Sequence, residues 1–387
     1  MLNKLKLGDY VIGGLLFWGI PSIAVTGPKI LLLVLIVSGT VWLIVASTSR
    51  PNLVNSQWII PKRGGFAIIV LVTIVYVFID EFFGRGKLGI NLFLNPGATD
   101  SFIDTANAES SGGGKGFVDL LGTVLIFLPF ALLDISSASR SSMRICATVT
   151  ACIFVFYDVG ISRGYLAISI VALVTGGGLK NRNLIAAAML ATLGFLCSSL
   201  VRGDFDRLAF QNPFVDSLVF PYINLGILID KLDVTSSWYS FVGQSMQKII
   251  PGFIISKEIF PFNIQMTLII YPQKDGLVDS VSVFTYLAEF IYYKPGWLTA
   301  VFSGIMLGIL SKGANVICIR LRLTKVRVFA GLMSVVLLRS RISDAISFLL
   351  ALCIFLLLWL GLCYLMRRIE VKCEERRRMG NQVSAAT

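Results

Sequence analysis

The amino-acid sequence predicts an all-α protein that crosses a membrane many times, and its composition is the first reason. Apolar residues make up 56% of the 387 residues, and charged residues only 14%, against about a quarter in soluble domains. The mean hydropathy is +0.80. So few charged groups could not cover the surface of a soluble protein of this size. The composition also excludes a disordered chain, a disulfide-rich secreted scaffold and a soluble nucleic-acid-binding protein, although the formal net charge is +12.

The second reason is a series of apolar segments close to the length of a spanning helix, which is about 20 residues and sometimes as few as 17. Ten such segments lie at 10–27, 29–46, 65–83, 117–134, 143–159, 164–179, 183–201, 296–312, 326–340 and 344–366. The first follows Lys4 and Lys6, as a signal peptide would. A second apolar segment begins almost at once, which favours an uncleaved first helix.

The distribution of lysine and arginine predicts that both termini are cytoplasmic. With the N-terminus inside, the inner loops and tails hold 20 of the 34 basic residues and five of the 22 acidic ones. Short loops rich in lysine and arginine remain on the cytoplasmic side. The basic run from Arg367 to Arg378 is then an anchor against anionic lipid. Membrane lipids are therefore expected partners, and nucleic acid is not.

This layout divides the chain into four parts. They are seven helices in 1–201 with an outer loop at 84–116, a long outer segment at 202–295, three helices in 296–366, and a basic cytoplasmic tail at 367–387. The outer segment is too long for a simple connection and carries apolar residues at helical spacing. It is predicted to form interfacial or re-entrant helices packed over the membrane domain. In the alternative, 214–229 and 250–270 cross the membrane.

The residue types present restrict the chemistry. The absence of histidine excludes proton transfer by histidine and histidine-ligated metal. The seven cysteines lie mostly in apolar stretches without CxxC spacing, which is typical of buried thiols and supports neither a disulfide nor a zinc site. The run from Ser111 to Gly116 lacks the spacing of a phosphate-binding loop. No metal and no cofactor are expected.

Five arginines are predicted near the outer face, where the positive-inside rule should deplete them. They are Arg163, Arg202, Arg207, Arg339 and Arg341. Any one of them is explained by a side chain that extends from a helix end toward the interface. Together they indicate an anionic ligand, because guanidinium groups bind phosphate or diphosphate through paired hydrogen bonds.

Carboxylates are predicted on the same face. Glu289 lies among apolar and aromatic residues where the outer segment returns to the membrane. Partial desolvation there would raise its pKa and suit it to accept a proton. The alternative is a surface glutamate paired with Lys294. Asp344 and the pair Asp80-Glu81 lie at helix ends near the arginines, and without histidine the proton acceptor at this face is Asp, Glu or Tyr.

Several short motifs follow one another across residues 140–345. They are Ser162-Arg163-Gly164 between two helices, Arg202 at the start of the outer segment, Ala288-Glu289 followed by Tyr292 and Pro295-Gly296, a helix with Gly304 and Gly308, and Arg339 or Arg341 before the final helix. In this arrangement the chain resembles the O-antigen (oligosaccharide repeat unit) polymerases of the Wzy type. It departs from the family at Tyr293-Lys294-Pro295-Gly296, where the family often has Asn-Phe-Gly.

The resemblance implies a metal-independent glycosyltransferase with a GT-C-like fold in the bacterial inner membrane. It would transfer a growing glycan from undecaprenyl diphosphate to a lipid-linked repeat unit at the periplasmic face, and a chain-length regulator is an expected partner. Arg163, Arg202 and Arg339 would hold the diphosphate, with Arg207 and Arg341 on the same face. Glu289 would accept the proton of the acceptor hydroxyl.

Three rival functions share parts of the pattern. An O-antigen ligase has the same topology and donor lipid but relies on a periplasmic histidine, which this chain lacks. A polyprenyl-phosphate-sugar glycosyltransferase would use an acidic pair such as Asp80-Glu81. A flippase, which is a transporter of lipid-linked repeats, would have repeated halves and ionisable groups at mid-membrane. The long outer segment favours an enzyme, and the second and third rivals stay open.

Overall fold

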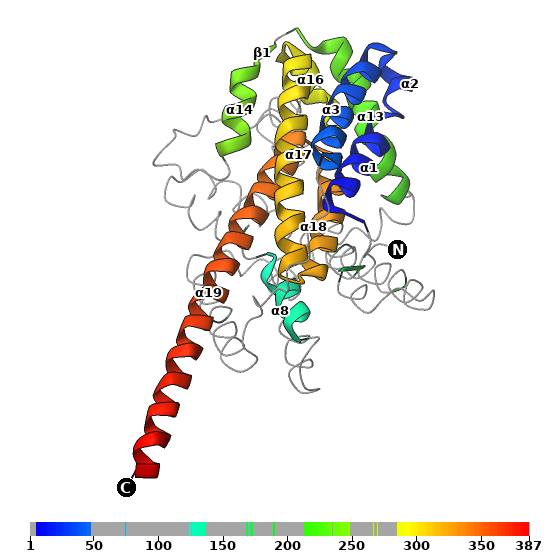
Figure 1. Cartoon of the computed structure of the whole chain (residues 1–387). Coiled ribbons are helices and arrows are strands. Elements are labelled where there is room, and N and C mark those ends of the chain that lie inside the picture. Colours follow the sequence, from blue (N-terminus) through cyan, green and yellow to red (C-terminus); the bar gives the residue numbers. More distant parts are fainter. Residues whose placement is uncertain are drawn as a thin grey trace.

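The computed structural model describes residues 5–47, 126–136, 213–233, 235–247 and 285–386, with single residues at 74, 124, 168, 171, 172, 189, 266 and 269. Within these residues the protein is mostly α-helical, with one pair of very short strands. In chain order the elements are α1 (Leu7–Gly19), α2 (Ile23–Thr26), α3 (Lys29–Ala46), α8 (Leu128–Ser136), α13 (Pro213–Lys231), β1 (Ser236–Ser237), α14 (Trp238–Gln247), α16 (Leu287–Tyr292), β2 (Tyr293–Lys294), α17 (Gly296–Arg320), α18 (Thr324–Leu337) and α19 (Ile342–Ala386) (Figure 1).

Four helical stretches of the described residues are long and apolar enough to cross a membrane. They are Leu7–Thr26, Lys29–Ala46, Gly296–Arg320 and Ile342–Cys373. They match the spans predicted at 10–27, 29–46, 296–312 and 344–366, so helices of spanning length are confirmed at these places. The segments predicted at 65–83, 143–159, 164–179 and 183–201 lie outside the described residues apart from a few single positions. The segment predicted at 117–134 is described at 124 and from 126 onward, where α8 begins at Leu128, and the number ten stays a prediction.

The helix predicted at 326–340 is present as α18 but is only 14 residues long. At about 1.5 Å per residue it measures roughly 21 Å, which is short of the roughly 30 Å of a hydrocarbon core. Phe329, Ala330 and Met333 are buried, and α18 packs against α1, α8 and α19. Its apolar sequence therefore reflects burial within the bundle, since few of its side chains face outward.

Helices α1, α3, α17, α18 and α19 pack into one bundle, in which α3, α17 and α19 run in one direction and α1 and α18 in the other (Figure 1). The amide of Leu7 donates to Asn315 Oδ1 at 3.2 Å, and Lys312 Nζ donates to Ser47 Oγ at 3.2 Å. The beginning of α1, the end of α3 and the second half of α17 thus share one end, called here the Asn315 end. The opposite end, where α16 meets the beginning of α19, is called the Glu289 end.

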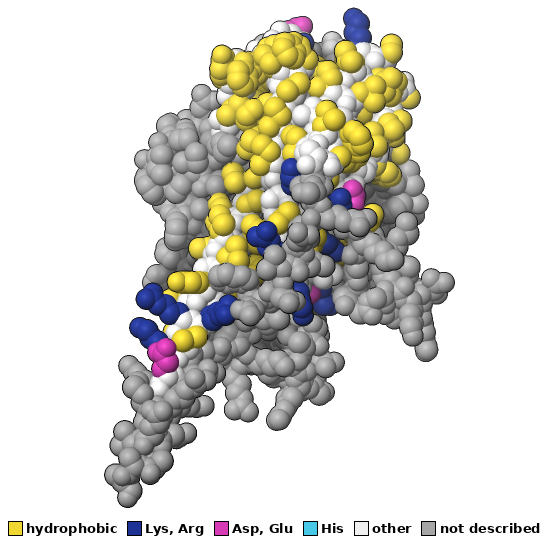
Figure 2. All heavy atoms as spheres, in the orientation of Figure 1, with side chains coloured by type: hydrophobic (Ala, Val, Ile, Leu, Met, Phe, Trp, Pro, Cys, Tyr) yellow, Lys and Arg dark blue, Asp and Glu magenta, His cyan; other side chains and the backbone are white. Residues whose placement is uncertain are grey.

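Helix α3 shows how the sequence produces a helix with one face in the bundle and one face outward. Ile30, Val34, Val37, Val41 and Val45 recur every three to four residues and are buried against the bundle. Leucines between them are exposed, with Leu32 at 61% and Leu43 at 63%. Figure 2 shows such hydrophobic side chains covering the upper part of the molecule. An apolar exterior is what lipid contact requires.

The contact between α3 and α17 depends on two glycines four residues apart. A Cβ at Gly304 would lie 2.8 Å from Thr40 Cβ and 3.0 Å from the carbonyl oxygen of Val37. A Cβ at Gly308 would lie 2.9 Å from Ile44 Cβ. Small residues at this spacing let two helix backbones approach closely, which is a common way to associate helices in lipid.

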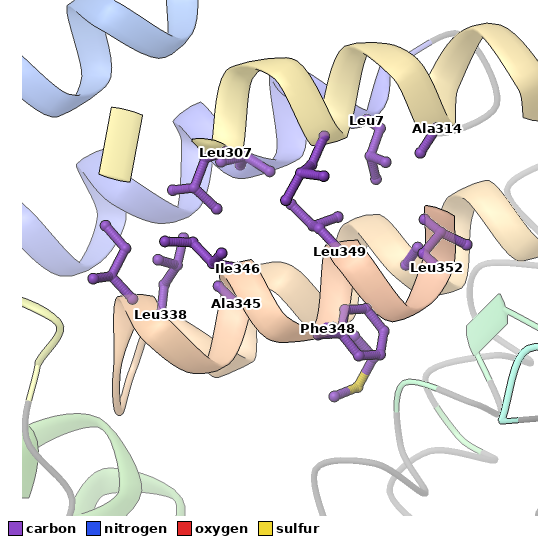
Figure 3. Close-up of a cluster of buried hydrophobic side chains, with 14 of the residues drawn as sticks. Leu7, Leu307, Ala314, Leu338, Ala345, Ile346, Phe348, Leu349 and Leu352 are labelled. Atoms are coloured by element: carbon purple, nitrogen blue, oxygen red, sulfur yellow. The ribbon is translucent and has the colours of Figure 1, made fainter. Parts of the chain in front are cut away.

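The core lies where α17 meets α1 and the α18–α19 pair. Leu7 and Leu307 pack there against Leu338, Ile346 and Leu349, all of them buried (Figure 3). Helix α8 closes another side of the core with aromatic rings. Phe130 stacks on Phe329 with ring centroids 4.1 Å apart.

The described part of the outer segment 202–295 forms helices that pack on the bundle. Helix α13 contacts α2 and α16, and Tyr222 Oη donates to the carbonyl oxygen of Phe17 at 3.2 Å. Its other face exposes Val219, Phe220 and Ile223. Helix α13 covers the alternative span 214–229 but is not among the four apolar candidates. The alternative span 250–270 lies outside the described residues apart from Met266 and Ile269.

Helix α19 continues through the segment predicted as a basic tail. It has 45 residues, and the exposed side chains of Arg367, Arg368 and Lys372 lie on its continuation past the apolar part. Figure 1 shows this continuation extending well beyond the other helices. The basic residues therefore sit on a helix that begins beside Glu289.

Candidate functional site

The site begins where the chain returns to the bundle through α16, β2 and the start of α17. Strand β2 pairs in parallel with β1, so Tyr293 lies opposite Ser236. A Cβ at Gly296 would overlap the carbonyl oxygen of Phe290, so only glycine allows this tight passage from α16 into α17. The Pro295-Gly296 pair of the sequence motif thus has a steric reason and fixes the position of α16.

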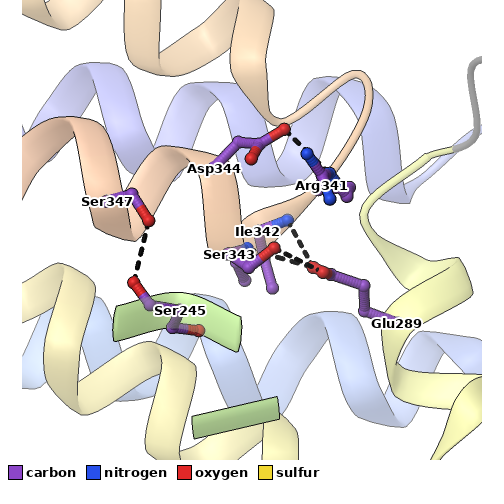
Figure 4. A network of polar contacts seen from close by, with 7 residues as sticks. All are labelled: Ser245, Glu289, Arg341, Ile342, Ser343, Asp344 and Ser347. Carbon is purple, nitrogen blue, oxygen red and sulfur yellow. Dashed lines mark hydrogen bonds and ion pairs between the residues drawn. The ribbon is translucent and has the colours of Figure 1, made fainter. Parts of the chain in front are cut away.

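Glu289 on α16 is fully buried, and its carboxylate contacts the first turn of α19 (Figure 4). Its Oε2 accepts hydrogen bonds from the amides of Ile342 at 2.7 Å and Ser343 at 3.0 Å. Its Oε1 accepts a hydrogen bond from Ser343 Oγ at 2.5 Å. The first amides of a helix have no partner within the helix. Glu289 therefore caps α19 from a segment more than fifty residues earlier.

Burial raises the pKa of Glu289 to about 7, although the positive charge of Arg341 and the hydrogen bonds from Ser343 oppose this shift. The direction agrees with the raised pKa that the sequence predicted from apolar surroundings. The alternative of a surface glutamate paired with Lys294 does not fit, because Lys294 is exposed and Glu289 is not. The charged form is favoured by the helix N-terminus that it caps.

Arg341 lies just before α19 and is held by Asp344. Its Nε donates to Asp344 Oδ2 at 2.8 Å, and each side chain is 12% exposed. Burial by itself would lower the pKa of Arg341, but the carboxylates of Asp344 and Glu289 outweigh this effect and raise it. The guanidinium of Arg341 is therefore charged, and it already forms an ion pair with Asp344, three residues further along the chain.

Arg339 occupies the same turn between α18 and α19 in a different way. Its Nε is buried and has no hydrogen-bond partner within the described residues. The turn is tied to the beginning of α16, because the amide of Tyr286 donates to the carbonyl oxygen of Leu338 at 3.3 Å. The hydroxyl of Thr285, which is fully buried next to this link, also lacks a partner there.

The structure thus brings together three of the six predicted site residues, namely Glu289, Arg339 and Arg341. The other three lie outside the described residues, as do Asp80 and Glu81; they are Arg163, Arg202 and Arg207. Sequence reasoning missed Ser343 and Thr285. Neither gives a signal in the sequence, because single hydroxyl residues beside helix ends are common.

Helix α14 adds polar and aromatic groups near the start of α19. Ser347 Oγ donates to the carbonyl oxygen of Ser245 at 2.8 Å (Figure 4). Trp238 and Tyr239 pack with ring centroids 4.3 Å apart, and Tyr239 is 69% exposed. Within the described residues no group of three acidic or cysteine side chains lies close enough to hold a metal. The groups in place can bind an anion and contact a flat, partly apolar ligand.

Comparison with known proteins does not extend this description. No protein-family model matches the chain, and neither the curated proteins nor the solved structures give a match. Fold and site define a helical protein with spanning-length helices and a buried carboxylate–arginine cluster at one end of its bundle.

Proposed function

We propose that the protein is a membrane glycosyltransferase that polymerises lipid-linked oligosaccharide repeat units. It acts at the periplasmic face of the bacterial inner membrane and transfers the growing glycan from undecaprenyl diphosphate to the incoming unit. One observation carries the proposal: the Glu289 carboxylate lies 2.7 Å from the amide of Ile342, next to the turn of Arg339 and Arg341. Two separate motifs of the resemblance thus meet at one buried contact.

The chemistry fits these residue types. The acceptor hydroxyl oxygen attacks the anomeric carbon, and the bond from that carbon to the diphosphate oxygen breaks. The diphosphate leaves with the bonding electron pair, so fixed positive charge must be in place before the reaction. Arginines supply such charge at any physiological pH. In a chain without histidine, the hydroxyl proton passes to a carboxylate or tyrosine, and Arg163, Arg202 and Arg207 are proposed to complete the diphosphate contacts.

The position of the charged groups favours this enzyme over the flippase. Between their ends, α1 and α3 carry only Asp9, in the first turn of α1, and α17 carries Lys312. Helix α18 carries Lys325 and Arg327 in its first turn. The cluster of Glu289, Arg341 and Asp344 lies instead where the helices begin or end. A transporter of a charged headgroup would be expected to carry ionisable groups at mid-membrane.

Lipopolysaccharide gels test the proposed function directly. A strain without the gene is compared with strains that carry the wild-type chain, Arg339→Gln, Arg163→Ala, Glu289→Ala or, as a matched control, the exposed Arg320→Gln at the Asn315 end. We expect the ladder to collapse to core plus one repeat unit without the gene, and Arg320→Gln to restore it. All variants should be present in the membrane, and Arg339→Gln, Arg163→Ala and Glu289→Ala should not restore the ladder. An unchanged ladder in the deletion strain contradicts the proposal, and loss of the single-repeat band favours the flippase or the lipid-sugar transferase.

A further inference from the structure

The geometry of Glu289 fits a structural contact better than a proton acceptor. Both carboxylate oxygens already accept hydrogen bonds from α19, three in all, and the side chain is fully buried. A general base must come within about 2.6–3.2 Å of the proton that it removes. The oxygens of Glu289 are directed at the backbone and hydroxyl of Ile342 and Ser343.

Helix α19 has no local alternative to this cap. The residue before its first turn is Arg341, whose side chain has donors only. Without Glu289, the amides of Ile342 and Ser343 would lose their acceptor in buried surroundings, which would destabilise the beginning of α19. On the other side of the turn, the amide of Tyr286 bonds to the carbonyl oxygen of Leu338. Segment 286–289 therefore holds the α18–α19 turn from both sides.

The turn carries two arginines with different neighbours. Arg341 is paired with Asp344, faces Glu289 and interacts electrostatically with Tyr293. Arg339 Nε is buried without an acceptor among the described residues. Thr285 and Arg339 are the chain neighbours of Tyr286 and Leu338, whose backbones are hydrogen-bonded to each other, and the hydroxyl of Thr285 too is buried and unpartnered within the described part. An N–H and an O–H without acceptors, on residues that flank one backbone hydrogen bond, suit an anionic oxygen.

We propose that Glu289 is a positioning residue: by capping α19 it holds the α18–α19 turn so that Arg339 and Thr285 bind a phosphate oxygen. Arg341 stabilises the turn and does not contact the ligand. That the phosphate belongs to the lipid diphosphate rests on the proposed function. Free pyrophosphate and phospholipid headgroups share the same chemistry, and the experiment distinguishes them.

Binding to purified full-length protein in detergent is the first test. The probes are undecaprenyl diphosphate, inorganic pyrophosphate, phosphatidylglycerol and, as an uncharged control, undecaprenol. We expect Arg339→Gln, Thr285→Val and Glu289→Leu to weaken binding of undecaprenyl diphosphate about tenfold or more, a difference of about 1.4 kcal/mol. Glu289→Gln keeps an acceptor oxygen for the helix amides and should remain within about threefold of wild type.

Arg341→Gln is the matched arginine control. We expect it to lower thermal stability, because the ion pair with Asp344 is lost, and to leave affinity within about threefold of wild type. Equal loss of affinity in Arg341→Gln and Arg339→Gln overturns the assignment of the two arginines. Should Glu289→Leu fail to fold, Ser343→Ala removes one of the three hydrogen bonds and should give a smaller loss of affinity in the same direction.

Turnover with a lipid-linked repeat unit separates positioning from proton transfer. A positioning role predicts that Glu289→Gln retains most of kcat and that Glu289→Leu mainly raises KM. If both variants lose kcat alike while binding is intact, Glu289 is a proton acceptor and the inference is wrong. If wild type binds pyrophosphate or phosphatidylglycerol as tightly as the lipid diphosphate, with the same dependence on Arg339, the phosphate site stands and the proposed function fails.

Discussion

Glu289 accepts two hydrogen bonds from Ser343, one from its amide at 3.0 Å and one from its hydroxyl at 2.5 Å. These two hydrogen bonds join α16 to the beginning of α19. The same device recurs at the Asn315 end, where Asp134 Oδ2 accepts from the amide of Lys325 at 2.8 Å and Asn315 Oδ1 accepts from that of Leu7. Apolar surroundings offer helix ends no water, so distant side chains supply the partners and tie the helices together.

The raised pKa of Glu289 predicts a specific pH dependence of stability. The pKa is about 7 in the folded protein and near 4.5 when the side chain is free, so between these values the folded state binds the proton more tightly. The contribution of this proton to the free energy of unfolding is fully present below about pH 4.5 and is lost as pH rises through about 7. Across this range the loss is up to about 1.4 kcal/mol per pH unit.

Thermal unfolding of wild type and Glu289→Gln from pH 5 to pH 8 checks this prediction. Because Glu289→Gln cannot titrate at this position, its melting temperature should rise relative to that of wild type as pH rises. Other titrating groups affect both proteins equally and cancel in the difference. Parallel curves for the two proteins would show that Glu289 does not titrate in this range.

Replacing Gly304 by alanine should loosen the contact between α3 and α17. Its Cβ would lie 3.0 Å from the backbone oxygen of Val37, which cannot turn aside as a side chain can. We expect a loss of about 1–3 kcal/mol in thermal unfolding in detergent. Gly313→Ala on the same helix is the control, since nothing lies within 4 Å of its Cβ, and it should be neutral or gain up to about 1 kcal/mol. Equal effects at both positions would argue against the close packing.

The cap that Asp134 provides for α18 should contribute as much to the free energy of unfolding as the cap that Glu289 provides for α19. Asp134→Ala removes the acceptor of the Lys325 and Val326 amides, and we expect a loss of about 1–2 kcal/mol, whereas Asp134→Asn keeps an acceptor oxygen and should lose less. Asp9→Ala is the matched comparison: Asp9 also accepts an amide hydrogen bond, from Lys6, but at an exposed position. A larger loss for Asp9→Ala than for Asp134→Ala would contradict a structural role of the partly buried Asp134 cap.

The sequence predicted helix positions best where apolar character alone determines them. The prediction 29–46 coincides with α3, Lys29–Ala46. The prediction for α17 ended at residue 312, but the helix continues to Arg320. Lys312 ends the apolar window but not the helix. Its side chain donates a hydrogen bond to Ser47 at the Asn315 end, so a charged residue is accommodated within α17. For α18, hydropathy could not distinguish burial within a bundle from contact with lipid.

The site was predictable in its residue types and not in its contacts. Charges counted between helices predict Glu289, Arg339 and Arg341 on one face, and the structure places Glu289 of α16 against the first residues of α19, next to the turn that carries both arginines. The pairing of Arg341 with Asp344 could be read from their spacing of three residues. The partners of Glu289 could not be read from the sequence, because the backbone amides of Ile342 and Ser343 have no signature there. A role as helix cap therefore becomes visible only when α16 and α19 are placed together.

Orientation in the membrane gives the last prediction. The Asn315 end carries most of the described basic residues, among them Lys6, Arg320, Arg322 and Lys325, and Figure 2 shows lysine and arginine mainly on the lower part of the molecule. By the positive-inside rule we expect this end to lie on the cytoplasmic side. Alkaline phosphatase, which is active only after export, should be inactive when fused after Arg322 or at the C-terminus. The same enzyme inserted after Asp233, at the Glu289 end, should be active. The reverse pattern would place the Glu289 cluster in the cytoplasm and remove it from the periplasmic donor lipid.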